Sequence, residues 1–261
     1  MEQEPKRSAQ NDAIEAALDR SDLYRWLSLA FRYPDADLAA HLQAPALIAL
    51  EAMLERLAGE ERDVLRPVLA GLRAASSSLD LTALQSEHRR LFGHIESSLY
   101  PPYETRYDIH HLFQQTQQLA DIAGFYRAFG LELSDGANER PDYLAIELEF
   151  LHFLSFKEAY ALEHHGPEQV GVTRDAEATF LRDHLLRWAP SFARRLKDQA
   201  GDGFYGQLAM VLLAFLKAEA ARLECDPAEE APLQPLTVLP EGCNFSCGLD
   251  GQSIDELISE R

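Results

Sequence analysis

Cysteine is scarce in this chain of 261 residues. The three cysteines, Cys225, Cys243 and Cys247, all lie near the C-terminus, which is too few and too clustered for the disulfide framework of a small secreted domain. The Cys243-x-x-x-Cys247 spacing departs from the C-x-x-C pair of a zinc ribbon, and no second pair follows it. A zinc or redox site at Cys243 and Cys247 is therefore less favoured than two free thiols, and we expect a reducing, cytoplasmic location.

Long hydrophobic runs are also missing. The longest, LAMVLLAFL at 208–216, falls well short of the roughly 20 apolar residues that cross a bilayer as a helix. The charged start, MEQEPKRSAQND, has no apolar core of the kind found in a signal peptide. We therefore expect no membrane insertion.

Basic residues are few. Lysine and arginine number 24 against 43 aspartates and glutamates, which gives a net charge of −19. A surface of this sign repels the phosphates of nucleic acids and attracts basic peptides or protein surfaces. The composition therefore argues against a nucleic-acid partner and favours a basic one.

Strand patterns and common catalytic motifs are absent too. The sequence has no alternating strand of useful length, no Asn-Gly hairpin and no fixed-period repeat. It also lacks the G-x-S-x-G, P-loop and G-x-G-x-x-G motifs. With 46% hydrophobic residues, the chain is expected to form an all-α, bundle-like domain of about ten helices. No constellation of residues argues for an enzyme or a cofactor, although an active site dispersed along the sequence stays possible.

Apolar residues recur at three- and four-residue steps over most of the chain. Gly130 is suited to a helix C-terminus and Pro141 to a helix start, and Thr82 with Gln85 forms a possible capping box. The predicted helices span 11–33, 47–57, 61–74, 82–92, 106–129, 142–165, 174–188, 190–199 and 204–223. They define a helical domain at 11–224, followed by an acidic, proline-rich and partly extended tail at 225–261 with a possible short helix at 253–259.

The stretch SLYPPYETRYD, residues 98–108, interrupts the helical pattern. Pro101 and Pro102 force extended backbone on the residues before them, so we expect Tyr100 and Tyr103 to project outward. Glu104 falls in the first turn of the following helix, where a carboxylate suits the helix dipole or an arginine of a partner. We call residues 100–107 the first motif.

A second proline-marked helix start is NERPDYLAIELE, residues 138–149. It places Glu139 and Asp142 at the start of the helix and Glu147 and Glu149 along it. Capping and a solvated face account for Asp142 and Glu149 about as well as a binding site does. Two acidic, aromatic helix starts separated by a single helix nevertheless favour a peptide-binding surface. We call residues 138–149 the second motif.

A metal site is the main alternative from the residues. Glu149-x-x-His152 has the i, i+3 spacing by which di-iron helical bundles bind metal, and Asp108-x-x-His111 is a degenerate second copy. Such a site also needs carboxylates from two further helices. The metal-dependent enzyme is therefore less favoured than surface roles for Glu149 and His152.

In sequence order, LQSEHRRLF (84–92), YPPYETRYD (100–108) and GLELSDGANERPDYLAIELEFLHFL (130–154) resemble the TorD/DmsD/NarJ family of molybdoenzyme assembly chaperones. The segment SDLYRWLSLAFRYPD (21–35) is similar to the N-terminal helix of that family. The resemblance covers most of residues 15–160. The family commonly has a histidine where this chain has Tyr143, and a tyrosine where it has His88.

The resemblance implies an all-helical, non-enzymatic protein that binds the immature catalytic subunit of a molybdopterin oxidoreductase. The client would be held for cofactor insertion through its twin-arginine signal peptide or an N-terminal remnant, by a monomer or a helix-swapped dimer. The implied client-binding residues are Tyr100, Pro101, Pro102, Tyr103, Glu104, Tyr107, Glu139, Pro141, Asp142, Tyr143 and Glu147. A helical scaffold for some other basic partner remains a further alternative.

Overall fold

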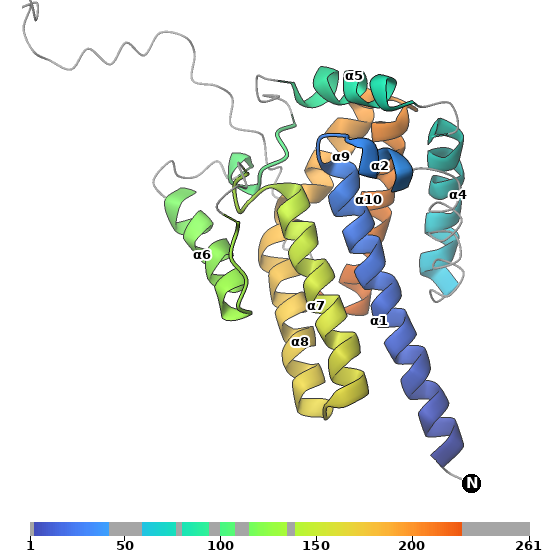
Figure 1. Ribbon diagram of the computed structural model, residues 1–261, viewed down its shortest axis with the longest axis vertical. Coiled ribbons are helices and arrows are strands. Elements are labelled where there is room, and N and C mark those ends of the chain that lie inside the picture. Colours follow the sequence, from blue (N-terminus) through green and yellow to red (C-terminus); the bar gives the residue numbers. More distant parts are fainter. Residues whose placement is uncertain are drawn as a thin grey trace, which may run out of the picture.

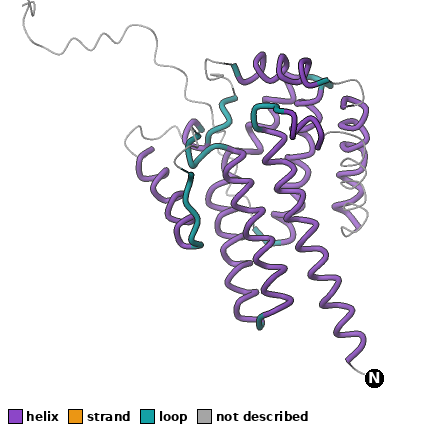
Figure 2. The backbone as a smooth tube through the Cα atoms, in the orientation of Figure 1, coloured by secondary structure: helices purple, strands orange, loops and turns teal. Residues whose placement is uncertain are grey.

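The computed structural model describes residues 3–41, 59–76, 80–93, 100–107, 115–134 and 139–225. The predicted helix at 47–57, the tail after residue 225 with Cys243 and Cys247, and Asp108 and His111 lie outside the described residues. Figure 2 shows helices joined by loops throughout the described part, with no strand in it. The predicted all-α fold is confirmed.

The described helices follow one another along the chain. Their bounds are α1 Gln3–Phe31, α2 Ala36–His41, α4 Gly59–Ser76, α5 Leu81–Phe92, η1 Glu104–Arg106, α6 Gln115–Ala128, α7 Leu144–His164, α8 Pro167–Phe180, η2 Leu181–Leu185, α9 Leu186–Ala200 and α10 Phe204–Arg222. Here η1 is a single 3₁₀ turn and η2 a π-helical turn.

The long helices form a bundle in which α1 packs on α7, α7 on α8, and α10 on both α9 and α4 (Figure 1). In the same view α5 crosses one end of the bundle, and α4 and α6 lie on opposite sides of it. Large aromatic side chains fill the interior, among them Trp188, Tyr24 and Phe215. Each such side chain contributes about 2–3 kcal/mol on burial.

Helix α10 forms the centre of this core, as its all-round apolar sequence predicts. Of the described helices it alone is long and apolar enough, by length and composition, to cross a membrane, and 72% of that stretch is buried within the protein. Its start lies very close to the preceding turn, because a Cβ on Gly206 would collide with the carbonyl oxygen of Gly201. Glycine is therefore required at 206.

Several helix starts differ from prediction, among them that of α8, which begins at Pro167 rather than near residue 174. Helix α1 begins at Gln3 rather than near Asn11, and polar residues fill its first turns. Helix α5 is capped by Asp80, whose carboxylate accepts a hydrogen bond of 2.7 Å from the Ala83 N–H. The predicted cap at Thr82 is therefore wrong, because an acceptor two residues earlier already satisfies the first turn.

The segment after the first motif also differs. A continuous helix was predicted from 106, but the chain makes the η1 turn at Glu104–Arg106, bends at Tyr107, and is helical again in α6 from Gln115. Gly130 ends this region at φ +73°, in the left-handed region that glycine adopts without steric cost. The predicted role of Gly130 is therefore confirmed.

The predicted break near residue 189 does not occur. Helices α8 and α9 join through the π turn η2, so the helical path runs unbroken from Pro167 to Ala200. The extra residue of a π turn rotates the helix face locally, and His184 within it is buried at 3% exposure. Pro190 lies inside α9, one turn after η2.

A buried ion network ties α1, α7, α8 and α10 together. Glu158 pairs with both Arg20 and Arg174 at 2.5 Å, and Arg222 pairs with Glu177 at 2.6 Å and with Glu219 at 2.8 Å. Burial raises the pKa of Glu177 to about 7; Arg222 opposes this shift, and the charges of Glu158 and Glu219 reinforce it.

Candidate functional site

The two motifs meet through their backbones. Pro101 and Pro102 lead into Tyr103, whose backbone is extended at φ −134° and ψ 128°, and an isolated antiparallel bridge joins Tyr103 to Tyr143. The Glu104 N–H donates to the Asp142 carbonyl and the Leu144 N–H donates to the Pro102 carbonyl, both at 3.0 Å. The start of α7 and the first motif are thereby fixed to one another.

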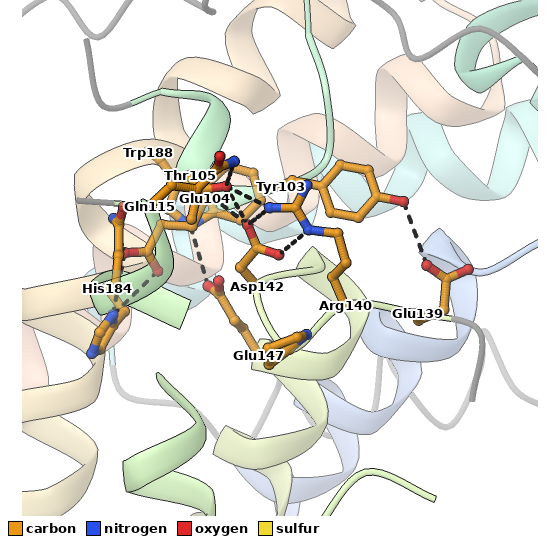
Figure 3. A network of polar contacts seen from close by, with 12 residues as sticks. Tyr103, Glu104, Thr105, Gln115, Glu139, Arg140, Asp142, Glu147, His184 and Trp188 are labelled. Atoms are coloured by element: carbon orange, nitrogen blue, oxygen red, sulfur yellow. Dashed lines mark hydrogen bonds and ion pairs between the residues drawn. The ribbon is translucent and has the colours of Figure 1, made fainter. Parts of the chain in front are cut away.

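Asp142 is the centre of the polar contacts at this joint (Figure 3). Its carboxylate has no exposed surface and accepts hydrogen bonds from the backbone N–H of Thr105 at 3.1 Å and from the Thr105 hydroxyl at 2.8 Å. Gln115, the first residue of α6, donates to the same hydroxyl oxygen at 3.0 Å. Asp142 therefore serves to join three segments rather than to face a partner.

Arg140 supplies the positive charge for this buried carboxylate. Its Nε donates to Oδ1 of Asp142 at 3.0 Å and its Nη2 to Oδ2 at 2.9 Å, while Nη2 also reaches the Thr105 hydroxyl at 2.6 Å. The guanidinium carbon lies 5.1 Å from the centroid of the Tyr103 ring. Two parallel hydrogen bonds make this a strong ion pair. Sequence reasoning missed the role of Arg140, although it lies in the second motif two residues before Asp142.

Glu104 forms a second buried contact, with the π turn. Its carboxylate oxygens both lie 3.2 Å from Nδ1 of His184, and Gln118 of α6 donates to Oε1 at 2.7 Å. Nε2 of His184 lies 3.7 Å from Asp121 of α6. No pattern around His184 marks it in the sequence, because only the widened helical turn directs it toward Glu104.

Glu147 is fully buried beneath this joint. Trp188 of α9 donates its indole N–H to Oε2 of Glu147 at 3.1 Å. Burial, together with the neighbouring charges of Glu104 and Asp142, raises the pKa of Glu147 well above its usual value. Burial among these carboxylates therefore disfavours the charged form of Glu147.

Most predicted client-binding residues face inward. Tyr100, Pro101, Pro102, Glu104, Tyr107, Asp142, Tyr143 and Glu147 are all buried, whereas Tyr103 and Pro141 are partly exposed and Glu139 is exposed. The expectation that Tyr100 projects outward and that Glu104 meets a partner's arginine is wrong. The sequence around Tyr100 and Glu104 does not show which distant segments pack over these two side chains.

Tyr143 replaces the histidine expected at its position and has a structural role. Its hydroxyl donates to the Phe31 carbonyl at 2.7 Å, which fixes the end of α1 to the start of α7. Burial raises its pKa, chiefly by removing the ring from water. Tyr143 thus supplies a hydrogen-bond donor at the start of α7, as the histidine common in the family could also do.

Aromatic rings gather in two groups, one at Tyr103 and Tyr143 of the joint and one around His88 of α5. The ring centroids of Tyr103 and Tyr143 lie 5.4 Å apart, those of Tyr33 and His88 lie 5.3 Å apart, and Phe92 lies 4.7 Å from His88. Tyr205 lies beneath His88 and Phe92 at 5.7 and 5.4 Å. Tyr33 is 51% exposed. We call Tyr33, His88, Phe92 and Tyr103 the aromatic face.

Acidic groups border this face, and its histidine is neutral. Burial lowers the pKa of His88 to about 4, so its ring carries no charge at pH 7. Glu139 is exposed and accepts a hydrogen bond of 3.4 Å from the Tyr103 hydroxyl, and Glu87 is half-buried on α5. Aromatic rings can stack on a guanidinium group while a neighbouring carboxylate forms an ion pair with it.

In the described part of the chain, no third side chain joins Glu149 and His152 to form the metal site considered from the sequence. Nδ1 of His152 lies 2.8 Å from the Ser21 hydroxyl and 2.9 Å from the Ser21 carbonyl, where it joins α7 to α1. Glu149 is exposed on α7. Among the described residues no group of three or more His, Cys, Asp or Glu side chains is arranged to hold a metal ion.

Known chaperones are similar to most of this chain. The chaperone protein TorD of Vibrio cholerae is 29% identical over 207 residues, which covers 77% of this chain and 90% of that protein. The perchlorate reductase assembly chaperone of Dechloromonas aromatica is 28% identical and covers 79% of this chain and 91% of its own length. The selenate reductase assembly chaperone of Thauera selenatis is 37% identical over 44% of this chain and 55% of its own length. These relatives are named as chaperones rather than enzymes.

A family model gives the same result over the region that contains both motifs. The model of the nitrate reductase delta subunit matches residues 49–194, more than half of the chain. This match includes α5, both motifs and α7, which are most of the segments that carried the resemblance in the sequence; the segment at 21–35 precedes it. The chain therefore belongs to the nitrate reductase delta subunit family, the TorD/NarJ family of molybdoenzyme assembly chaperones.

Proposed function

We propose that this chain is a cytoplasmic assembly chaperone that binds the immature catalytic subunit of a molybdopterin oxidoreductase and holds it for cofactor insertion. Contact is made with the client's twin-arginine signal peptide or an N-terminal remnant. Family membership supports the chaperone role, and the names of relatives that assemble perchlorate, selenate and chlorate reductases support this class of client.

The observation that carries the binding site is the aromatic face. It combines the exposed ring of Tyr33 with the partly exposed rings of His88, Phe92 and Tyr103, all supported from below by buried contacts. Rigid aromatic side chains provide a large contact area at small entropic cost. The buried joint of the two motifs therefore acts as a support that holds Tyr103 and Glu139 in position.

The charges complement a basic peptide. Glu139 and Glu87 border the face, together with Arg89, which donates to the Tyr33 hydroxyl at 2.8 Å, and Arg90, which lies 3.8 Å from Glu87. The whole chain carries −19, so that encounter with an arginine-bearing segment is favoured at low salt. A client guanidinium can stack on the exposed ring of Tyr33 while it pairs with a carboxylate, whereas the Tyr103 ring already lies against Arg140.

The test measures binding of purified chain to apo catalytic subunits of perchlorate, selenate and chlorate reductases. We expect the double variant Tyr33→Ser, Tyr103→Ser to weaken binding at least about tenfold, since aromatic hot spots contribute about 2 kcal/mol each. Val172→Ser, at a side chain 59% exposed on α8, should leave affinity unchanged. Equal affinity of the double variant and the wild type would remove the aromatic face from the site.

A further inference from the structure

A groove of about 500 Å³ lies on the outer side of α7. Its walls are the end of α1, the last turn of α6 with the loop after it, and the exposed side of α7. The lining residues are Arg32, Tyr126, Leu131, Glu132, Leu133, Ser134, Ile146, Glu149, Phe150, His152, Phe153 and Phe156. We call this the α7 groove.

The interior of the α7 groove is largely apolar. Leu131 and Leu133 come from the loop, and Ile146 and Phe153 come from α7, all four only partly buried. Phe156 is 50% exposed at the rim. Aliphatic and aromatic side chains gathered in a concave surface are typical of sites that bind apolar segments of other molecules.

Charged residues of both signs lie at the groove. Glu132 on the loop and Glu149 on α7 are both exposed. Opposing charges come from Arg32, which follows α1, and from Lys157, whose amino nitrogen lies 5.6 Å from the centroid of the Phe153 ring. The ring of His152 is held by Ser21. Two carboxylates on different walls, in a chain of charge −19, complement a lysine or arginine flanked by apolar side chains.

The groove adjoins the aromatic face but is separate from it. Arg32 lines the groove, and its chain neighbour Tyr33 belongs to the aromatic face. Tyr126 of the groove donates its hydroxyl hydrogen to the Pro141 carbonyl at 2.8 Å. The loop at 139–143 therefore contacts the α7 groove through Tyr126 and the aromatic face through Tyr103.

We infer that the α7 groove is a second client-binding surface, which takes an apolar segment carrying a lysine or arginine between Glu132 and Glu149. The occupant is a part of the client polypeptide, and to that extent the inference rests on the proposed function. Apolar side chains fill the groove beside Ile146 and Phe153, and the basic side chain pairs at the rim.

The test uses two fluorescent synthetic peptides of leucine and alanine, one with a central lysine and one with a central glutamate, titrated against the full chain. Wild type should bind the lysine peptide about fivefold more tightly, since an exposed charge pair is worth up to about 1 kcal/mol. Glu149→Lys should reverse the preference, whereas Glu168→Lys, exposed on α8, should not. Phe156→Glu should weaken both peptides at least about tenfold and Val172→Glu neither.

Several outcomes overturn the inference. One is a Glu149→Lys variant that still prefers the lysine peptide over the glutamate peptide. Another is that the chain associates with itself rather than with the peptides, and that Phe156→Glu abolishes this self-association. If apo catalytic subunits bind Phe156→Glu as tightly as wild type, the groove is not a client site although the proposed function stands. If the peptides behave as expected but no apo subunit binds wild type, the proposed function fails, and with it the assignment of the occupant to a client.

Discussion

Asp142 shows what sequence can predict about a single residue and where such prediction ends. The second motif predicted a role for Asp142 in contact with a client. In the structure Asp142 is instead a buried partner of Arg140 and Thr105. Its position in the interior depends on a segment some 37 residues away in sequence. A helix-start pattern around Asp142 contains no information about that distant segment.

Asp142→Ala is predicted to destabilise the protein by about 3 kcal/mol or more. The change leaves the Arg140 guanidinium without its bidentate partner and removes the acceptor of the Thr105 N–H, and breaking a buried pair from one side typically costs 3–5 kcal/mol. Urea unfolding followed by circular dichroism measures the change.

Glu139→Ala is the matched control, because Glu139 belongs to the same motif but is exposed. Its free energy of unfolding should stay within about 0.5 kcal/mol of wild type. Equal losses of stability in Asp142→Ala and Glu139→Ala would contradict the claim that buried Asp142 supports the fold whereas exposed Glu139 does not.

The raised pKa of Glu177 predicts a pH dependence of stability. The folded state binds a proton with a pKa of about 7, against 4.5 for the free side chain. Stabilisation from this group is therefore fully present below about pH 4.5 and is lost as pH rises through 7. The loss approaches about 3 kcal/mol, at about 1.4 kcal/mol per pKa unit.

Glu177→Gln should flatten this part of the stability profile between pH 5 and 8. The amide cannot ionise, yet it keeps an oxygen that can accept from Arg222. Glu168→Gln, on the exposed side of the same helix, should retain the wild-type slope. A Glu177→Gln profile that parallels wild type would show that Glu177 is ionised throughout this range.

At the scale of elements, hydrophobic periodicity predicted the long packed helices well. Helices α7 and α10 have nearly the predicted bounds, because their pattern and their burial agree. The π turn η2 was missed, since its formation depends on how His184 packs against Glu104 and on the rings of Phe125 and Phe180. The 3₁₀ turn η1 was missed for a similar reason, as Asp142 fixes its first N–H groups.

His184→Ala is predicted to loosen α6 selectively. The variant loses the contact with Glu104, the approach to Asp121 and the ring contact with Phe125, and the last two are contacts with α6. Hydrogen exchange in 115–128 should accelerate at least about tenfold, because a local opening that is easier by 1.4 kcal/mol has this effect. Mass spectrometry of peptic fragments measures it.

Arg182→Ala is the control for this element, since Arg182 lies in the same π turn with its side chain exposed. Exchange in α6 should match wild type in this variant. An acceleration spread evenly over α1, α7 and α10 in His184→Ala would indicate general unfolding and would contradict a local role for His184.

At the scale of the whole molecule, helices assemble a surface from parts that are far apart in the sequence. The aromatic face takes Tyr33 from the chain after α1, His88 and Phe92 from α5, and Tyr103 from the first motif. Sequence reasoning could predict the all-α fold, the acidic charge and the pairing of the motifs. It did not predict Tyr33 and Phe92 as members of the face, because the contact of Tyr33 with His88 arises only when α5, which also carries Phe92, crosses the end of the bundle (Figure 1).

The central claim is that this molecule recognises an immature catalytic subunit. Its most direct test is a titration of the full chain with one molybdopterin oxidoreductase catalytic subunit in two forms, apo and cofactor-loaded, by calorimetry. The account predicts a one-to-one complex with the apo form that is at least about tenfold tighter than with the loaded form, a difference of about 1.4 kcal/mol. Equal affinity for both forms, or no complex with apo subunits of the perchlorate, selenate and chlorate reductases, would contradict it.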